Sequence, residues 1–372
     1  MKIAGIAFAV SAAASVAACS GSPSTTATSA PPTIVTPAPV FAYVPTNGKG
    51  EAGVGTSIIG YRVNRATGAL TKAAVLPLPT GHQPNDLLVD RHGRFAYLTM
   101  LNADWVSVFA IDRTTGALKA SSTIAQKGAG ADDMALAPSG GYLYLSDMTF
   151  GKICVFRIDA KNGALAPARD QPCQTSAFGA TTIDGAGTFA YGSNEAGTQT
   201  AVFAIDRTTG ALRPVGAPVP SGGAVLLDPT GKYAFVNSVN SSTRYARDQH
   251  SGALRGAGAT VPSINVFDDS ATFAWGFDAG LYPALSGITA YAFDSANGVL
   301  TRAGHVAFPA GTQYPGCLTY FEGRLYAQST RASDGASTAS TYSVDEKSGR
   351  LKLVSSTAAG YNAECVAFAN GQ

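Results

Sequence analysis

The segment Asp112-Arg-Thr-Thr-Gly-Ala-Leu118 is one of seven copies of a turn that recurs through most of the chain. An Asp or Asn side chain can accept hydrogen bonds from the amides of a turn, and Gly readily adopts a positive φ. We therefore interpret Asp112 and its counterparts as turn-forming residues and not as catalytic carboxylates. Successive copies are separated by 48, 47, 47, 42, 46 and 51 residues, measured between Gly68, Gly116, Gly163, Gly210, Gly252, Gly298 and Gly349.

A second motif, Gly93-Arg-Phe-Ala-Tyr97, lies between two of these turns and also recurs. Each repeat alternates turn residues with four short apolar runs, such as LKASSTIA at residues 118–125. Four strands in 42–51 residues are typical of a β-propeller blade. The sequence thus predicts an all-β, seven-bladed β-propeller with four antiparallel strands in each blade. The Asp residues that precede the second motif are also interpreted as turn formers: Asp90, Asp184, Asp228 and Asp268.

The two ends of the repeat region are incomplete blades. Residues 364–372 match an innermost strand with no second strand after it, while residues 41–44 match a second strand with no first. We expect the two ends to share one closing blade, which would remove the open edges of the ring.

Composition narrows the class of protein. Charged residues make up 13% of the chain, and 42 Gly and 20 Pro disfavour a mainly helical fold. The formal net charge is +2 without runs of like charge, so the sequence gives no indication of nucleic-acid binding.

The N-terminus has the features of an export signal. An Ala-rich apolar stretch follows Lys2 and ends in Val16-Ala-Ala-Cys19, which resembles the cleavage site of bacterial lipoproteins. We expect residues 1–18 to be a signal peptide and Cys19 to be lipidated; an ordinary signal peptide is the alternative. Residues 19–40 would be a Ser/Thr/Pro/Ala-rich tether, followed by the propeller over residues 41–372. This predicts a monomer anchored through lipid in the bacterial cell envelope, at the outer membrane facing the periplasm.

Within residues 41–372 the chain resembles the lactonase-type seven-bladed propellers, which include 6-phosphogluconolactonases and overlap the Tyr-Val-Thr-Asn repeat proteins. The resemblance rests on the Asp-x-x-Thr-Gly-Ala-Leu turns, on Tyr43-Val-Pro-Thr-Asn47, and on Phe189-Ala-Tyr-Gly-Ser-Asn-Glu195. It implies that Glu195 is an active-site candidate. Family enzymes also carry His and Arg around the channel mouth, often as His-x-His, whereas this chain has four His and no such pair.

Aligning the repeats predicts which residues surround one mouth of the central channel. The residue at the start of each inner strand is Glu364, Asp86, Asp133, Ala180, Ala224, Ile264 and Gly316, in order around the ring. Three carboxylates thus fall on consecutive blades. Further polar residues expected on the same face are Asn85, Asp132, His82, Asp147 and Glu195.

Three interpretations of these acids remain open. They are solvated or bonded to loop amides, or they bind a ligand or cation, or they carry out acid–base chemistry. Asp86, Asp133 and Glu364 could hold Ca²⁺ or Mg²⁺, since hard cations take carboxylate oxygens. Like charges held together also raise a carboxyl pKa, as general acid–base catalysis requires.

Four cysteines remain after Cys19, which in an exported domain favours disulfides. Two lie in adjacent strands of one blade and two in neighbouring inner strands, so we predict the pairs Cys154–Cys173 and Cys317–Cys365. Buried free thiols are the alternative.

Two functions follow from these observations. We favour a binding protein whose acidic mouth takes a small ligand, a cation or a protein partner, with no required cofactor. The alternative, implied by the resemblance, is a lactone hydrolase that uses Glu195, His82 or Asp86.

Overall fold

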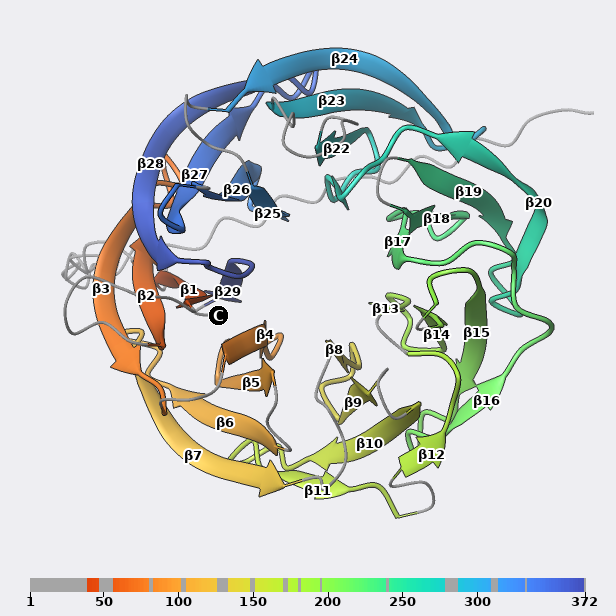
Figure 1. Cartoon of the computed structure of the whole chain (residues 1–372), viewed down its shortest axis with the longest axis horizontal. Coiled ribbons are helices and arrows are strands. Elements are labelled where there is room, and N and C mark those ends of the chain that lie inside the picture. Colours follow the sequence, from red (N-terminus) through yellow and green to blue (C-terminus); the bar gives the residue numbers. More distant parts are fainter. Residues whose placement is uncertain are drawn as a thin grey trace, which may run out of the picture. The chain divides into compact units, whose positions relative to one another are not determined.

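The computed structural model is a ring of seven β-sheets, the predicted propeller (Figure 1). The structure describes residues 39–46, 56–79, 83–101, 105–125, 133–147, 151–169, 173–179, 182–194, 196–238, 241–277, 287–308, 314–331 and 333–370. The predicted signal peptide, Cys19 and nearly all of the tether therefore lie outside the described residues. The described residues contain no candidate membrane-spanning helix.

The sheets follow one another along the chain, and each has its inner strand next to the central channel. The first sheet is β29 (Ala367–Asn370), β1 (Val40–Thr46), β2 (Ser57–Val63) and β3 (Leu70–Pro77). The second is β4 (Gln83–Val89), β5 (Phe95–Leu101), β6 (Trp105–Ile111) and β7 (Leu118–Ala125). The third is β8 (Asp133–Leu136), β9 (Tyr142–Asp147), β10 (Lys152–Ile158) and β11 (Leu165–Pro167), and β12 (Cys173–Thr175) also pairs with β10.

The other four sheets repeat this pattern. The fourth is β13 (Thr182–Ile183), β14 (Phe189–Ser193), β15 (Thr200–Ile205) and β16 (Leu212–Pro214). The fifth is β17 (Ala224–Leu227), β18 (Tyr233–Asn237), β19 (Ser242–Arg247) and β20 (Leu254–Val261). The sixth is β21 (Val266–Phe267), β22 (Phe273–Phe277), β23 (Gly287–Asp294) and β24 (Val299–Ala307). The seventh is β25 (Tyr314–Phe321), β26 (Arg324–Thr330), β27 (Ala336–Val344) and β28 (Leu351–Tyr361).

The predicted closing blade is confirmed. The C-terminal strand β29 pairs antiparallel with β1, so that Phe41 lies opposite Ala369. The inner strand is shorter than predicted. It begins at Ala367, so Glu364 lies in the segment before the strand. A cluster of buried side chains, including Val40 and Ala42 of the first sheet and Tyr326 of the seventh, packs the closing junction. Similar clusters pack the other junctions between neighbouring sheets.

The two repeated motifs contact each other across these junctions. Gly116 has a φ of 76°, and a Cβ added there would lie 2.2 Å from the ring of Phe41 in the preceding blade. The Tyr43 hydroxyl donates a hydrogen bond to the Gly116 carbonyl at 2.9 Å. Tyr191 donates to Gly252 in the same way. The motifs recur together because the aromatic residues of one blade pack against the turn glycine of the next.

The turn aspartates have the structural role that the sequence predicts. Asp112 accepts hydrogen bonds from the amides of Thr114 and Thr115 at 2.8 and 3.0 Å, and these bonds lower the pKa of its carboxyl. Asp90 accepts bonds from the amides of Arg94 and Phe95 at 2.5 and 2.8 Å.

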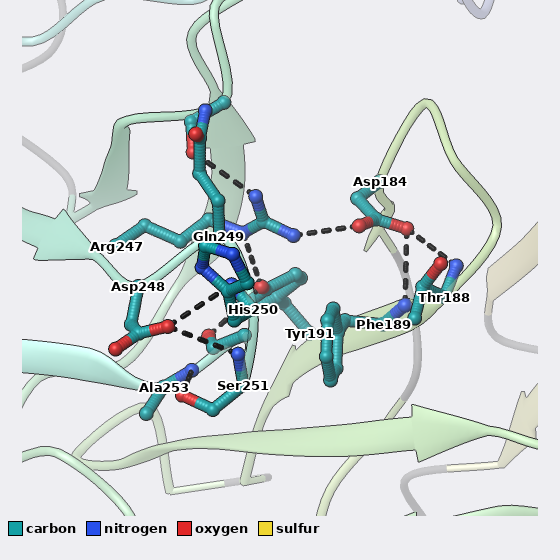
Figure 2. A network of polar contacts seen from close by, with 12 residues as sticks. Asp184, Thr188, Phe189, Tyr191, Arg247, Asp248, Gln249, His250, Ser251 and Ala253 are labelled. Atoms are coloured by element: carbon teal, nitrogen blue, oxygen red, sulfur yellow. Dashed lines mark hydrogen bonds and ion pairs between the residues drawn. The ribbon is translucent and has the colours of Figure 1, made fainter.

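A buried ion pair joins the fourth and fifth sheets (Figure 2). Arg247 Nη2 lies 2.6 Å from Asp184 Oδ2, and the two side chains are only 4% and 9% exposed. The Arg247 Nε donates to the Tyr191 hydroxyl at 2.5 Å, and its Nη1 donates to the Gly231 carbonyl at 3.0 Å. The second oxygen of Asp184 accepts bonds from the amides that begin β14. Both oxygens of Asp184 and all three nitrogens of the Arg247 guanidinium thus have hydrogen-bond partners within the protein.

Candidate functional site

Three acidic residues lie where neighbouring inner strands begin. Asp86 is in β4 and Asp133 begins β8, and the Met134 amide donates to both carboxylates, at 3.2 Å to Asp86 Oδ2 and 2.9 Å to Asp133 Oδ1. Glu364 is fixed by its amide, which donates to the Pro45 carbonyl at 2.9 Å. Asp86 and Asp133, from neighbouring blades, thus share the Met134 amide as a donor, and the position of all three carboxylates on one rim stays a prediction of the repeat alignment.

A β-bulge orients Asp86. The register of β4 with β5 shifts between Pro84 and Leu87, and the Asp86 amide donates to Thr99 Oγ1 at 3.1 Å. Bulges commonly redirect a side chain near a functional site. Thr99 was not identified from the sequence as a residue that positions Asp86. The only indication in the sequence is a polar residue two positions after Tyr97.

The environment raises the carboxyl pKa of two of these residues, Asp86 and Glu364. Burial raises the pKa of Asp86 to about 6, against the opposing effect of the bonds from the Met134 and Leu87 amides. Burial, and then the charge of Asp86, raises the pKa of Glu364 to about 7. Near neutral pH, Asp86 is therefore mostly ionised while Glu364 retains its proton about half of the time.

The other residues predicted at the channel mouth lie in different places. Asn85 lies beside Asp86 in the bulge of β4. Asp147 ends β9 and is 2% exposed, so it is buried in the blade. The remaining three candidates, His82, Asp132 and Glu195, lie outside the described residues.

No three His, Cys, Asp or Glu side chains in the described part of the chain are placed to hold a metal ion. The Met134 amide already bonds to an oxygen of Asp86 and of Asp133. Binding of Ca²⁺ or Mg²⁺ at this mouth stays a prediction.

The structure contains two disulfides at the positions that the strand pattern favours. Cys154 and Cys173 face each other across β10 and β12, with their Cα atoms 3.9 Å apart. Cys317 and Cys365 join the seventh sheet to the segment before β29, with a Cα separation of 5.3 Å. The second bond cross-links the closing junction one residue from Glu364.

Comparison with solved structures gives related folds at low sequence identity. A candidate 6-phosphogluconolactonase from Bacteroides uniformis shares 18% identity, with a TM-score of 0.70 over 89% of this chain and 99% of that one. The periplasmic gluconolactonase of Pseudomonas aeruginosa shares 14% identity, with a TM-score of 0.69 over 90% of this chain and 100% of that one. At such low sequence identities, the structural similarity shows that these proteins share the fold. No curated protein matches the sequence.

A family model does match the sequence itself. The model described as lactonase, 7-bladed beta-propeller, matches residues 25–129 and 57–228, which together span more than half of the chain. The match covers Asp86 and Asp133, and the seven sheets have the architecture that the family description names. The chain therefore belongs to the lactonase family of seven-bladed β-propellers.

Proposed function

We propose that this protein hydrolyses small neutral lactones at its acidic channel mouth. The observation that carries the proposal is the pair formed by Asp86 and Glu364, two carboxyl groups from neighbouring blades with pKa values raised to about 6 and about 7. Such a pair supplies a base and an acid at the same pH, which is the requirement for general acid–base catalysis.

Each carboxyl group has a defined task in this mechanism. Ionised Asp86 takes a proton from a water molecule as the water oxygen attacks the lactone carbonyl carbon. Protonated Glu364 gives its proton to the ring oxygen as the bond between that oxygen and the carbonyl carbon breaks. The product is a hydroxy acid, and a proton passing from Asp86 to Glu364 restores the starting state.

Charge at the mouth favours a neutral substrate. The described acids Asp86, Asp133 and Glu364 would repel a phosphorylated lactone. By sequence, the segments between residues 46 and 333 that lie outside the described residues contain no Arg, two Lys and six acidic residues, among them Asp132 and Glu195. We therefore propose unphosphorylated sugar lactones as the substrate class.

The second candidate is binding without turnover. The mouth residues that the structure describes include no His or Arg to stabilise the negative charge that forms on the carbonyl oxygen, which favours a binding role. Under this alternative, the acids hold a small ligand, a protein partner, or Ca²⁺ or Mg²⁺. For the hydrolase, we also propose catalytic roles for Glu195, which the sequence resemblance implies, and for His82, which the repeat alignment predicts at this mouth. Lipidation at Cys19, which would place the domain in the cell envelope, is also a proposal that rests on the Val16-Ala-Ala-Cys19 sequence.

The proposal is tested by an assay of the hydrolysis of glucono-δ-lactone and of its 6-phosphate, in which the protons released by the acid product are measured. We expect turnover of the neutral lactone, with maximal kcat/KM between about pH 6 and pH 7, because Asp86 must be ionised and Glu364 protonated. Asp86→Asn and Glu364→Gln should each lower kcat by about 100-fold or more. Asp112→Asn, in a turn away from this mouth, should leave kcat unchanged.

Two outcomes would count against hydrolysis. Absence of turnover of either lactone above the uncatalysed rate, together with a rise in Tm on adding Ca²⁺ or Mg²⁺, would support the binding alternative. Full activity of both mouth variants would show that the reaction takes place elsewhere.

A further inference from the structure

We propose that a second site, at the junction of the third and fourth sheets, binds a small saccharide with two anionic groups. The site consists of two adjoining pockets that share Tyr142 as a lining residue, with volumes of about 440 and 600 Å³. Figure 1 shows the junction between β8–β11 and β13–β16. The pockets are built from β-turns and outer strand segments, and they share no lining residue with the acidic mouth.

All charged residues that line the two pockets are arginines. Arg91 and Arg207 line the smaller pocket, and Arg157 and Arg169 line the larger one, with no Asp or Glu among the lining residues. Guanidinium groups bind carboxylate and phosphate oxygens through paired N–H donors.

Most of these cations are unpaired in the described part of the chain. The guanidinium groups of Arg157, Arg169 and Arg207 make no ion pair or hydrogen bond with another described residue. Arg91 donates to His92 Nε2 and to the Pro138 carbonyl, and it forms no ion pair with a described residue.

The nearby acids bond to turn amides and form no ion pair with these arginines. Asp206, directly before Arg207, accepts bonds from the amides of Thr208 and Thr209 at 2.9 and 3.2 Å. Asp159 accepts a bond from the Lys161 amide at 2.7 Å. The junction therefore has an excess of positive charge in a chain whose net charge is only +2.

The smaller pocket also contains a buried hydroxyl without a hydrogen-bond partner. Tyr144 lines the smaller pocket and is fully buried, yet its hydroxyl has no hydrogen-bond partner among the described residues. The equivalent Tyr43, Tyr191 and Tyr326 each donate to the carbonyl of a turn glycine, whereas Tyr97 of the second blade, like Tyr144, has no partner among the described residues. A buried polar group without a partner is uncommon and needs an explanation, such as a ligand or a bound water.

The shape of the site suggests how the ligand lies. The Tyr142 hydroxyl donates to the Thr208 carbonyl, which fixes the Tyr142 ring between the two pockets. An aromatic ring flanked by cations suits a sugar, because the ring can pack on an apolar sugar face while each anionic group lies near one pair of arginines. The pocket volumes fit a molecule of one or two sugar units.

Isothermal titration calorimetry with three probes tests this inference. The probes are fructose 1,6-bisphosphate, digalacturonate and neutral maltose, each at low and at physiological salt. We expect at least one anionic probe to bind, with affinity falling as salt rises, and maltose not to bind. A phosphate preference or a carboxylate preference would each support the site and identify the anion class.

Matched variants separate the site from nonspecific attraction. Arg207→Ala should weaken binding about tenfold, whereas Arg113→Ala, at the same position of the identical Asp-Arg-Thr-Thr-Gly-Ala-Leu turn in the second blade, should not change it. Tyr144→Phe should weaken binding several-fold without lowering Tm, because the hydroxyl has no partner to lose.

Three results would overturn the inference. They are no binding of either anion at millimolar concentration, equal binding of maltose, and equal weakening by Arg113→Ala and Arg207→Ala. None of them bears on lactone hydrolysis, because the acidic mouth has different residues.

Discussion

A chain that ends at Ala363 is expected to lose about 5–8 kcal/mol of unfolding free energy, and its Tm should fall by about 10 °C or more. The deletion removes β29, which supplies the inner strand of the first sheet. It also removes the Cys317–Cys365 disulfide and the buried side chains of Val366 and Ala369. The newly exposed edge of β1 should also promote association between chains.

Two matched chains make this measurement specific. A chain that ends at Asn370 keeps β29 and the disulfide, and its Tm should equal that of the parent. A Cys317→Ala/Cys365→Ala double variant removes only the cross-link and should lose part of the stability. If the chain that ends at Ala363 has the parental Tm, closure through β29 does not stabilise the ring.

Replacing Asp184 by Asn should destabilise the fold by about 3–5 kcal/mol, because it leaves the Arg247 guanidinium buried without a counter-charge. Arg247 is 4% exposed and lies between the fourth and fifth sheets, where water cannot replace the lost carboxylate. The hydrogen bonds from Arg247 to Tyr191 and Gly231 hold it in place, so it cannot turn towards solvent without breaking them. Chemical denaturation of the parent and the variant measures the effect.

Asp90→Asn is the matched control for this prediction. Asp90 accepts two amide bonds in the equivalent turn, but its ion-pair partner Arg94 is 39% exposed and 3.5 Å away. This variant should lose no more than about 1 kcal/mol. Equal losses in the two variants would mean that the buried pair contributes nothing beyond the turn bonds.

The fold was predictable from the sequence because it is repetitive. Seven turns at similar spacing predict seven sheets. The strand-like segments 41–44 and 364–372, which have no partner strands in their own repeats, predict the closing blade. The repeat alignment also predicts Asp86, Asp133 and Glu364 on one rim, because equivalent positions in a ring of repeats lie on the same face. The strand positions of the cysteines gave both disulfide pairings for the same reason.

Features that depend on individual packing could not be predicted. The bulge that orients Asp86 leaves no periodic signal, and the raised pKa values depend on burial that a repeat alignment does not contain. Asp147 has the right position for the rim but is buried at the end of β9. Arg247 and Asp184 are 63 residues apart, and the other repeats lack an equivalent pair that would have revealed them.

The most direct test of the shared acidic rim is the pKa of Glu364, measured by carboxyl-carbon NMR in the parent and in Asp86→Asn. The parent value should be about 7, and it should fall when the Asp86 charge is removed, yet stay above the ordinary glutamate value because burial is the larger cause. Asp112→Asn should not change it. A parental pKa near the ordinary value, or one that Asp86→Asn leaves unchanged, would contradict the account, because the two carboxyl groups would then not share the mouth of one channel.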